Sequence, residues 1–88
     1  MKMIIAIVND EDSERVTHAL THASFRVTTI ASTGGFLRKG QTTLLCASED
    51  ALLPAALDVI RACFPPAGDE TPTRCKIFVL NIVESYRY

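Results

Sequence analysis

The fold of this chain is decided by the stretch FRVTTIASTGGFLRKGQTTLLCA, residues 25–47. Residues 25–30 and 42–47 are rich in Val, Thr, Ile and Leu, and we expect both segments to be β-strands. Residues 32–41 contain three glycines and several polar side chains, a composition typical of a loop. Two strands are therefore predicted to follow one another directly, with no helix between them.

A strand and a helix are predicted before this pair. Residues 3–8 form a continuous apolar, β-branched run, which is typical of a buried strand. Asp10 or Asp12 can cap a helix that continues to about residue 24. Its apolar side chains recur at i, i+3, i+4 and i+7, on one helical face: Val16, Ala19, Leu20 and Ala23.

A second helix and a last strand are predicted after the pair. Ser48, Glu49 and Asp50 can cap a helix that reaches about Cys63, and Pro54 must lie in its first turn because proline has no N–H to donate. Its apolar stripe consists of Leu53, Leu57, Ile60 and Phe64, with Leu52 and Ala56 beside it. Prolines and a glycine then predict a helix stop and a loop over residues 65–74, and residues 75–83 form the last strand.

The predicted order is β-α-β-β-α-β, in a single domain of residues 1–88. This is the split-βαβ, ferredoxin-like plan of the α+β class, with two helices on one face of a four-stranded antiparallel sheet. No segment remains to cover the other sheet face. Because 48% of the residues are hydrophobic, we expect sister subunits to bury that face.

Composition excludes several classes of protein. A net charge of −1 is unlike that of general nucleic-acid binders, which carry a clear basic excess. No apolar run approaches the roughly 18–20 residues that a membrane span needs, and the apolar start is too short for a signal peptide. Cys46, Cys63 and Cys75 all lie in apolar runs and are expected to be buried, reduced thiols, which indicates a cytoplasmic protein.

Enzymatic and RNA-binding interpretations find little support in the motifs. Gly35 to Thr42 has the spacing of a phosphate-binding P-loop, but Gln41 replaces the essential lysine and the segment lies between two strands. An RNA-recognition motif stacks bases on aromatic residues of its central strands, and residues 42–47 contain none. The cysteines are expected to be buried, and the two histidines lie on a helix that is remote in sequence from the glycine-rich loop, so no catalytic set of nucleophile and base is predicted.

A metal site is a second possibility. His18 and His22 lie at i and i+4 on the first helix, a spacing that can hold a metal ion, and Glu14 precedes them by one turn. No third ligand is required by the sequence. A solvated helix face is the preferred interpretation, and a small metal-binding trimer is retained as an alternative.

The glycine-rich loop offers the chemistry for a nucleotide. Its glycines permit positive φ angles, which a plain hairpin connection would also use. Phe36 and Leu37 are costly to expose in a mere connector, and Arg38 and Lys39 add positive charge. Together with Arg26 and Thr28 on the preceding strand, the loop presents a ring, cations, hydroxyls and backbone donors, which suit a purine base and a phosphate.

These residues carry a resemblance to a known family. The apolar start at residues 1–8 with its acidic continuation, the F-R-V-T of residues 25–28 and the T-G-G-F-L-R of residues 33–38 are similar to those of the PII-like cyclic-di-AMP receptors. The resemblance covers residues 1 to about 64 and resumes at residues 78–80. It implies a homotrimer of ferredoxin-like subunits with one cyclic-di-AMP in each intersubunit cleft. It also implies a signalling protein without enzymatic activity or cofactor, acting on an unknown downstream protein.

The resemblance also implies roles for single residues. Arg26 and Thr28 would contact the ligand from the second strand, and Phe78 would line the pocket from the last strand. The loop residues that would wrap the ligand are Gly35, Phe36 and Leu37, with the Phe36 ring against an adenine. Arg38 would supply charge, and Lys39 and Gln41 are second-rank candidates.

The chain departs from the family pattern at three places. Gln41 stands where the family commonly has Asn, and Ala47 adds a methyl group near the cleft where a glycine is usual. The second loop, residues 65–74, is much shorter than the long excursion of the family. A trimeric scaffold that has lost nucleotide binding is therefore the alternative function.

Overall fold

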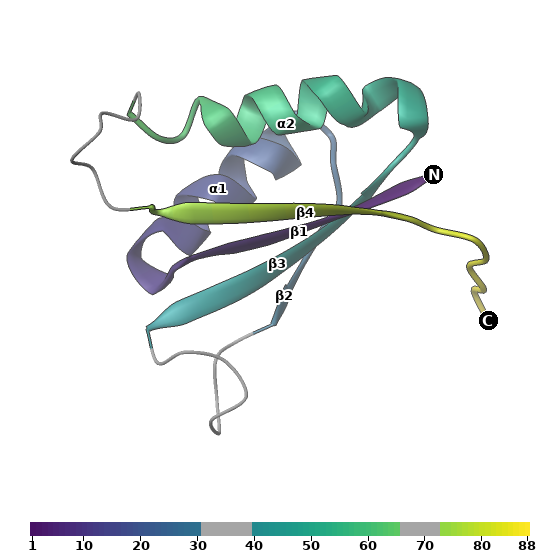
Figure 1. Cartoon of the computed structure of the whole chain (residues 1–88), viewed down its shortest axis with the longest axis horizontal. Helices are drawn as coiled ribbons and strands as arrows, with labels where there is room; N and C mark the ends of the chain where they lie inside the picture. The colour runs from purple at the N-terminus through teal and green to yellow at the C-terminus, as the bar shows by residue number, and fades with distance from the viewer. Residues whose placement is uncertain (31–39, 66–72) are drawn as a thin grey trace.

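The computed structural model describes residues 1–30, 40–65 and 73–88. It is an α+β fold with the predicted β-α-β-β-α-β order and one additional 3-10 turn (Figure 1). Most of the two loops, predicted at residues 32–41 and 65–74, lies outside the described residues. The elements are β1 (Lys2–Asn9), α1 (Asp10–His22), β2 (Val27–Ile30), β3 (Gln41–Ser48), the 3-10 turn η1 (Asp50–Leu52), α2 (Leu53–Arg61) and β4 (Cys75–Asn81).

The four strands form one sheet in the order β2-β3-β1-β4, and every neighbouring pair is antiparallel. The central strand β1 pairs with β3 on one side, where Ile5 lies opposite Leu45, and with β4 on the other, where Ile5 lies opposite Phe78. Both helices cover the same face of this sheet (Figure 1). The fold class predicted from the sequence is confirmed.

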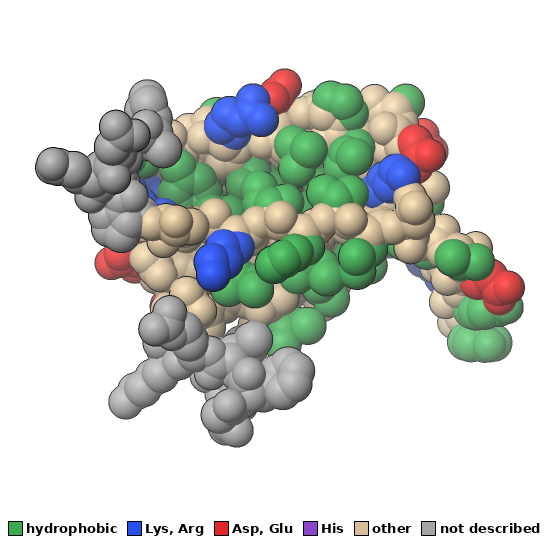
Figure 2. Space-filling view, in the orientation of Figure 1, with side chains coloured by type: hydrophobic (Ala, Val, Ile, Leu, Met, Phe, Trp, Pro, Cys, Tyr) green, Lys and Arg blue, Asp and Glu red, His purple; other side chains and the backbone are tan. Residues whose placement is uncertain are grey.

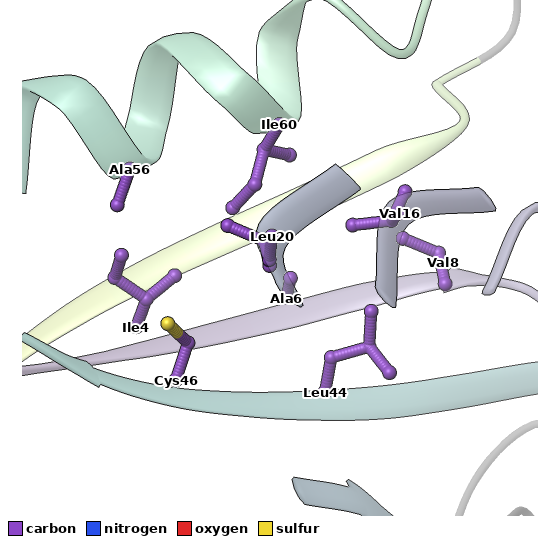
Figure 3. Packing of buried hydrophobic residues seen from close by; sticks show 9 residues of the cluster. All are labelled: Ile4, Ala6, Val8, Val16, Leu20, Leu44, Cys46, Ala56 and Ile60. Carbon is purple, nitrogen blue, oxygen red and sulfur yellow. The ribbon is translucent and has the colours of Figure 1, made fainter. Parts of the chain in front are cut away.

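The core lies between the helices and this covered face (Figure 3). Side chains alternate along a strand, so Ile4, Ala6 and Val8 of β1 point toward the helices while their neighbours point away. Val16 and Leu20 of the predicted α1 stripe meet them, whereas Ala23 is exposed. In α2, Ile60 of the predicted stripe and Ala56 beside it are buried, and Leu53 and Leu57 are only partly buried. The buried cluster consists of Ile4, Ala6, Val8, Val16, Leu20, Leu44, Cys46, Ala56 and Ile60. Full burial of each larger aliphatic side chain contributes about 1.5–3 kcal/mol.

The start of α1 differs from the prediction. Asn9 is the N-cap residue, without a side-chain cap bond, and Asp10 is already the first helical residue. The predicted capping by Asp10 or Asp12 is therefore wrong. Both carboxylates instead bond to side chains from later in the chain: Asp10 to Thr42, and Asp12 to Arg74.

The end of α1 shortens the following strand. Ser24 takes a left-handed conformation with φ 71°, and the Phe25 N–H donates to the Leu20 carbonyl, 2.9 Å from N to O. This is the bond pattern of a Schellman helix end. Phe25 consequently belongs to the helix end and packs against the core, so β2 begins at Val27 rather than at residue 25.

Proline positions the start of α2 as expected. Asp50–Leu52 form a 3-10 turn, and Pro54 lies within the first two positions of α2, where its missing N–H costs nothing. The last strand ends at Asn81, two residues earlier than predicted, and the chain then leaves the sheet (Figure 1). None of the helices in the described part of the chain combines the length and apolar composition that crossing a bilayer requires.

The cysteines only partly match their prediction. Cys46 is buried in the core, whereas Cys63 and Cys75 are half-buried. Burial raises the pKa of the Cys46 thiol, and burial together with the nearby Asp12 and Cys63 raises the pKa of Cys75 to about 11. Cys46 and Cys75 are therefore protonated thiols at neutral pH.

A buried carboxylate ties the start of α1 to the start of β4. Asp12 is only 1% exposed, and its Oδ1 lies 2.7 Å from one Arg74 nitrogen and 2.9 Å from one Arg15 nitrogen. Both guanidinium groups also lie over the Phe64 ring, 5.6 Å away for Arg15 and 5.5 Å for Arg74. The hydrogen bond and charge of Arg74, aided by Arg15, hold the pKa of Asp12 below its ordinary value against the opposite effect of burial.

This ion pair predicts a pH-dependent loss of stability. Asp12→Ala should lower the free energy of unfolding at pH 7 by roughly 1–3 kcal/mol, because two charged donors lose their acceptor. A lowered folded-state pKa means that the stabilisation is present above the unfolded pKa, about 3.9, and disappears as the pH falls through the folded pKa. The difference between Asp12→Ala and the native protein should accordingly persist down to about pH 4 and shrink below it.

Urea unfolding followed by circular dichroism, repeated between pH 7 and pH 3, measures this difference. Asp58→Ala is the matched control, because the Asp58–Arg61 pair is exposed, with its N and O 3.3 Å apart. The control should change stability little at any of these pH values. Equal effects of the two substitutions would contradict the role of Asp12.

Candidate ligand-binding face

The sheet face that no helix covers, here called the open face, carries the second set of alternating side chains. The register of the strands assigns its members, because partners that lie opposite one another in a sheet point to the same side. The open face consists of Met3, Ile5, Ile7, Asn9, Thr28, Ile30, Gln41, Thr43, Leu45, Ala47, Lys76, Phe78 and Leu80. Four residues that the sequence predicts as ligand contacts, Thr28, Gln41, Ala47 and Phe78, are among them.

Thr28 and Phe78 lie in one row across the open face. Thr28 is opposite Leu45, Leu45 is opposite Ile5, and Ile5 is opposite Phe78. Since β2 and β4 are the two edges of the sheet, three strand spacings separate these residues, or roughly 14 Å at about 4.8 Å per spacing. The two predicted contacts therefore stand at opposite edges of one subunit.

Ala47 and Gln41 lie elsewhere on the same face. Ala47 is opposite Met3, which is opposite Leu80, so Ala47 belongs to the row next to that of Thr28. Gln41 is half-buried at the first position of β3, opposite Asn9. Arg26 is exposed and directly precedes β2.

Large apolar side chains are exposed on this face. Phe78 and Leu80 are each 52% exposed, and Ile30 is 44% exposed. Ile77 and Val79, on the opposite face of β4, are also exposed, and hydrophobic side chains gather on both sides of that strand (Figure 2). An edge strand that is apolar on both faces is a surface that proteins normally cover by association.

The charge on the open face suits an anion. Lys76 is on the face itself and Arg26 adjoins it, and the four strands contain no Asp or Glu on either face. Thr28 contributes an exposed hydroxyl, and Phe78 an exposed ring on which a base could stack. The described part of the face thus combines cations, a hydroxyl and an aromatic surface.

The glycine-rich loop joins the end of β2 to the start of β3. Gly35, Phe36, Leu37, Arg38 and Lys39 lie outside the described residues. The last residue before the loop and the first ones after it are close, because Ile30 pairs with Thr43.

Gly40, at the end of the loop, has φ 87°, a conformation that favours glycine. Apart from its chain neighbours, no atom of the described residues lies within 4 Å of the position that a Cβ would occupy. The requirement for glycine there is therefore one of backbone conformation.

The histidines do not form a metal centre with other described residues. His18 and His22 are exposed on α1. Within residues 1–30, 40–65 and 73–88, no group of three His, Cys, Asp or Glu side chains is placed to hold a metal ion. The arrangement agrees with the solvated helix face that the sequence indicates.

The sequence analysis missed the contacts made by the first turn of α1. It assigned Asp10 and Asp12 only to capping, whereas each bonds to a residue that follows a loop, Thr42 or Arg74. The only signal for these contacts was the presence of unpaired acids before a helix, which is equally typical of caps.

Comparison with known proteins agrees with the fold. A family model described as "Cyclic-di-AMP receptor" matches residues 1–65, a segment that includes Arg26, Thr28, Gln41 and Ala47 but ends before Phe78. The crystal structure of a functionally unknown protein from Pediococcus pentosaceus ATCC 25745 is similar with a TM-score of 0.75 and 26% sequence identity, over 99% of this chain and 96% of that chain. The fold is thus shared over nearly the whole length, including β4.

The family match covers three quarters of the chain and extends from β1 through α2. It points to a binding role rather than a catalytic one, in agreement with an open face that carries polar and aromatic groups. The chain belongs to the cyclic-di-AMP receptor family.

Proposed function

We propose that this chain is a non-enzymatic, cytoplasmic PII-like signalling protein that binds cyclic-di-AMP or a related adenine nucleotide between the subunits of a homotrimer. The observation that carries the proposal is the common placement of Thr28, Gln41, Ala47 and Phe78 on the open face, in a chain of the cyclic-di-AMP receptor family. Binding would change the order of the loops and so alter a downstream protein.

The separation of Thr28 and Phe78 supports a site between subunits. Within one chain, Leu45 and Ile5 occupy the roughly 14 Å between them, at about 4.8 Å per strand. A compact ligand would touch both residues readily where the β2 edge of one subunit adjoins the β4 edge of another. The exposed apolar side chains of the open face, including Leu80 and Ile30, would then be buried between subunits.

The proposed contacts divide by chemistry. Arg26 and the Thr28 hydroxyl would hold phosphate or sugar oxygens, with the backbone of Gly35 and the charge of Arg38. Phe36, Leu37 and Phe78 would enclose the adenine bases, on which aromatic rings stack favourably. Gln41 and Ala47 would contact the ligand edge, where this chain differs from the family pattern.

The alternatives have less support. A scaffold without ligand would keep the apolar interface but would have no need of the exposed Thr28 hydroxyl or of the cations Lys76 and Arg26 at the open face. A metal-binding trimer would need ligands from neighbouring subunits, because the described residues of one chain hold no cluster of three.

The first prediction concerns the ligand. Isothermal titration should show binding of cyclic-di-AMP to the native protein, and Thr28→Val and Phe78→Ala should each weaken it by about tenfold, the loss expected for one hydrogen bond or one stacked ring. His18→Ala, on the exposed face of α1, is the control and should leave the affinity unchanged. A native protein that binds no adenine nucleotide but is trimeric would support the scaffold instead.

The second prediction concerns the trimer. Light scattering on a sizing column should give three times the 9.6 kDa of one chain. Leu80→Asp should reduce this mass because it introduces a charge into the open face, whereas Ala55→Asp places the same charge on the exposed side of α2 and should not. A native protein with the mass of one chain would contradict any trimeric function.

A further inference from the structure

The first turn of α1 holds the end of the glycine-rich loop. The Asp10 N–H donates to the Gly40 carbonyl, 2.8 Å from N to O. The Thr42 hydroxyl donates to Asp10 Oδ1. Asp10 therefore holds the chain where it enters β3 through two hydrogen bonds, one from its backbone and one to its side chain.

These contacts determine which side of the sheet Gln41 faces. Thr42 is 7% exposed and points toward α1, so Gln41, the residue before it, points to the open face. A shift of one residue in this register would exchange the two faces and remove the Gln41 side chain from the ligand side. Asp10 and Thr42 thus position Gln41 without lying on the open face themselves.

The same helical turn also contacts Arg74, at the end of the second loop. Asp12 lies two residues after Asp10 and accepts hydrogen bonds from Arg74 Nε at 3.4 Å and from its terminal nitrogen at 2.7 Å. The Arg74 guanidinium also lies over Phe64, 5.5 Å from the ring centroid. Phe64 lies just before the segment 66–72, and Arg74 lies just after it. By binding Arg74, Asp12 holds these two flanking residues against each other.

We propose that the first turn of α1 is a coupling element that positions the end of the glycine-rich loop through Asp10 and the base of the second loop through Asp12. None of Asp10, Asp12, Thr42 and Arg74 is among the proposed ligand contacts. The ligand-dependent part of this coupling rests on the proposed function: when ligand binding shifts residues 40–42, the shift is transmitted through α1 to Arg74. The coupling is reciprocal, since two equilibria that share one element must affect each other equally.

Rigidity makes this transmission physically reasonable. Asp10 and Asp12 lie in one turn of a 13-residue helix, whose backbone bonds prevent them from moving independently. Asp12 cannot exchange Arg74 for water without cost, because its carboxylate is buried. A shift at Thr42 must therefore displace the Asp12–Arg74 pair or break the Thr42–Asp10 bond.

A first experiment tests the coupling without any ligand. Thr42→Val removes the hydroxyl at nearly constant volume, and Thr42→Ser keeps it, so the two variants isolate the bond to Asp10. Amide hydrogen exchange resolved by NMR should be several-fold faster at Phe64 and at Arg74–Lys76 in Thr42→Val, but close to native in Thr42→Ser. Arg61→Ala, which removes only the exposed Asp58–Arg61 pair, should leave these amides unchanged.

Identical exchange at Phe64 and Arg74–Lys76 in Thr42→Val and the native protein would overturn the proposal. Should Thr42→Val fail to fold, the variant Asp10→Ala takes its place, because it removes the acceptor of the same hydrogen bond. The expected and the contradicting results are then the same.

A second experiment adds cyclic-di-AMP. Thr42→Val should bind it about tenfold more weakly than the native protein, the effect of one lost positioning bond, whereas Thr42→Ser should bind normally. Ligand should change the amide shifts of Phe64 and Arg74–Lys76 in the native protein, and Arg74→Ala should abolish this response at Phe64. A full response of Phe64 in Arg74→Ala would contradict the coupling. If the native protein binds no cyclic-di-AMP, the proposed function fails, and the ligand-free exchange still decides the coupling.

Discussion

Every feature of this molecule depends on the pairing of β1 with β3 and β4. This central strand alternates Ile4, Ala6 and Val8 toward the helices with Met3, Ile5 and Ile7 toward the open face. The first set supports the core beneath both helices (Figure 3), and the second forms the middle of the open face. Because the side-chain period of a strand is two, the same register fixes both faces at once.

The open face carries both a hydroxyl and an aromatic ring, but these two groups are far apart within one subunit. Thr28 and Phe78 share a row, yet the sheet order places them on opposite edges. The edge strand β2 is short, and the other edge strand, β4, is apolar on both of its sides (Figure 2). A subunit built in this way has the proposed ligand contacts at two edges. In the proposed trimer, association would bring these edges together, and burial of the apolar face would provide the free energy for it.

The sequence alone predicted the order of the elements, because the strands and helices have distinct periods and Pro65, Gly34 and Gly35 mark the loops between them. It also placed Pro54 correctly, since few positions in a helix accept proline. It could not predict that Thr28 and Phe78 share a row, since that depends on three pairings between strands distant in sequence. The Asp12–Arg74 pair joins residues 62 positions apart, and Ser24 ends α1 in a conformation that is usual for glycine, so neither had a local signal.

The central claim, a ligand site completed by two subunits, is tested most directly by mixing defective subunits. Thr28→Val and Phe78→Ala chains, each of which impairs one half of the site, are co-expressed with different tags and the mixed oligomers are isolated. If Thr28 of one subunit and Phe78 of another form each site, some clefts of the mixed oligomer contain both native residues, and titration should recover native affinity for cyclic-di-AMP at that fraction of sites. If the mixed oligomers bind no more tightly than either variant alone, the site is not shared between subunits and the account is wrong.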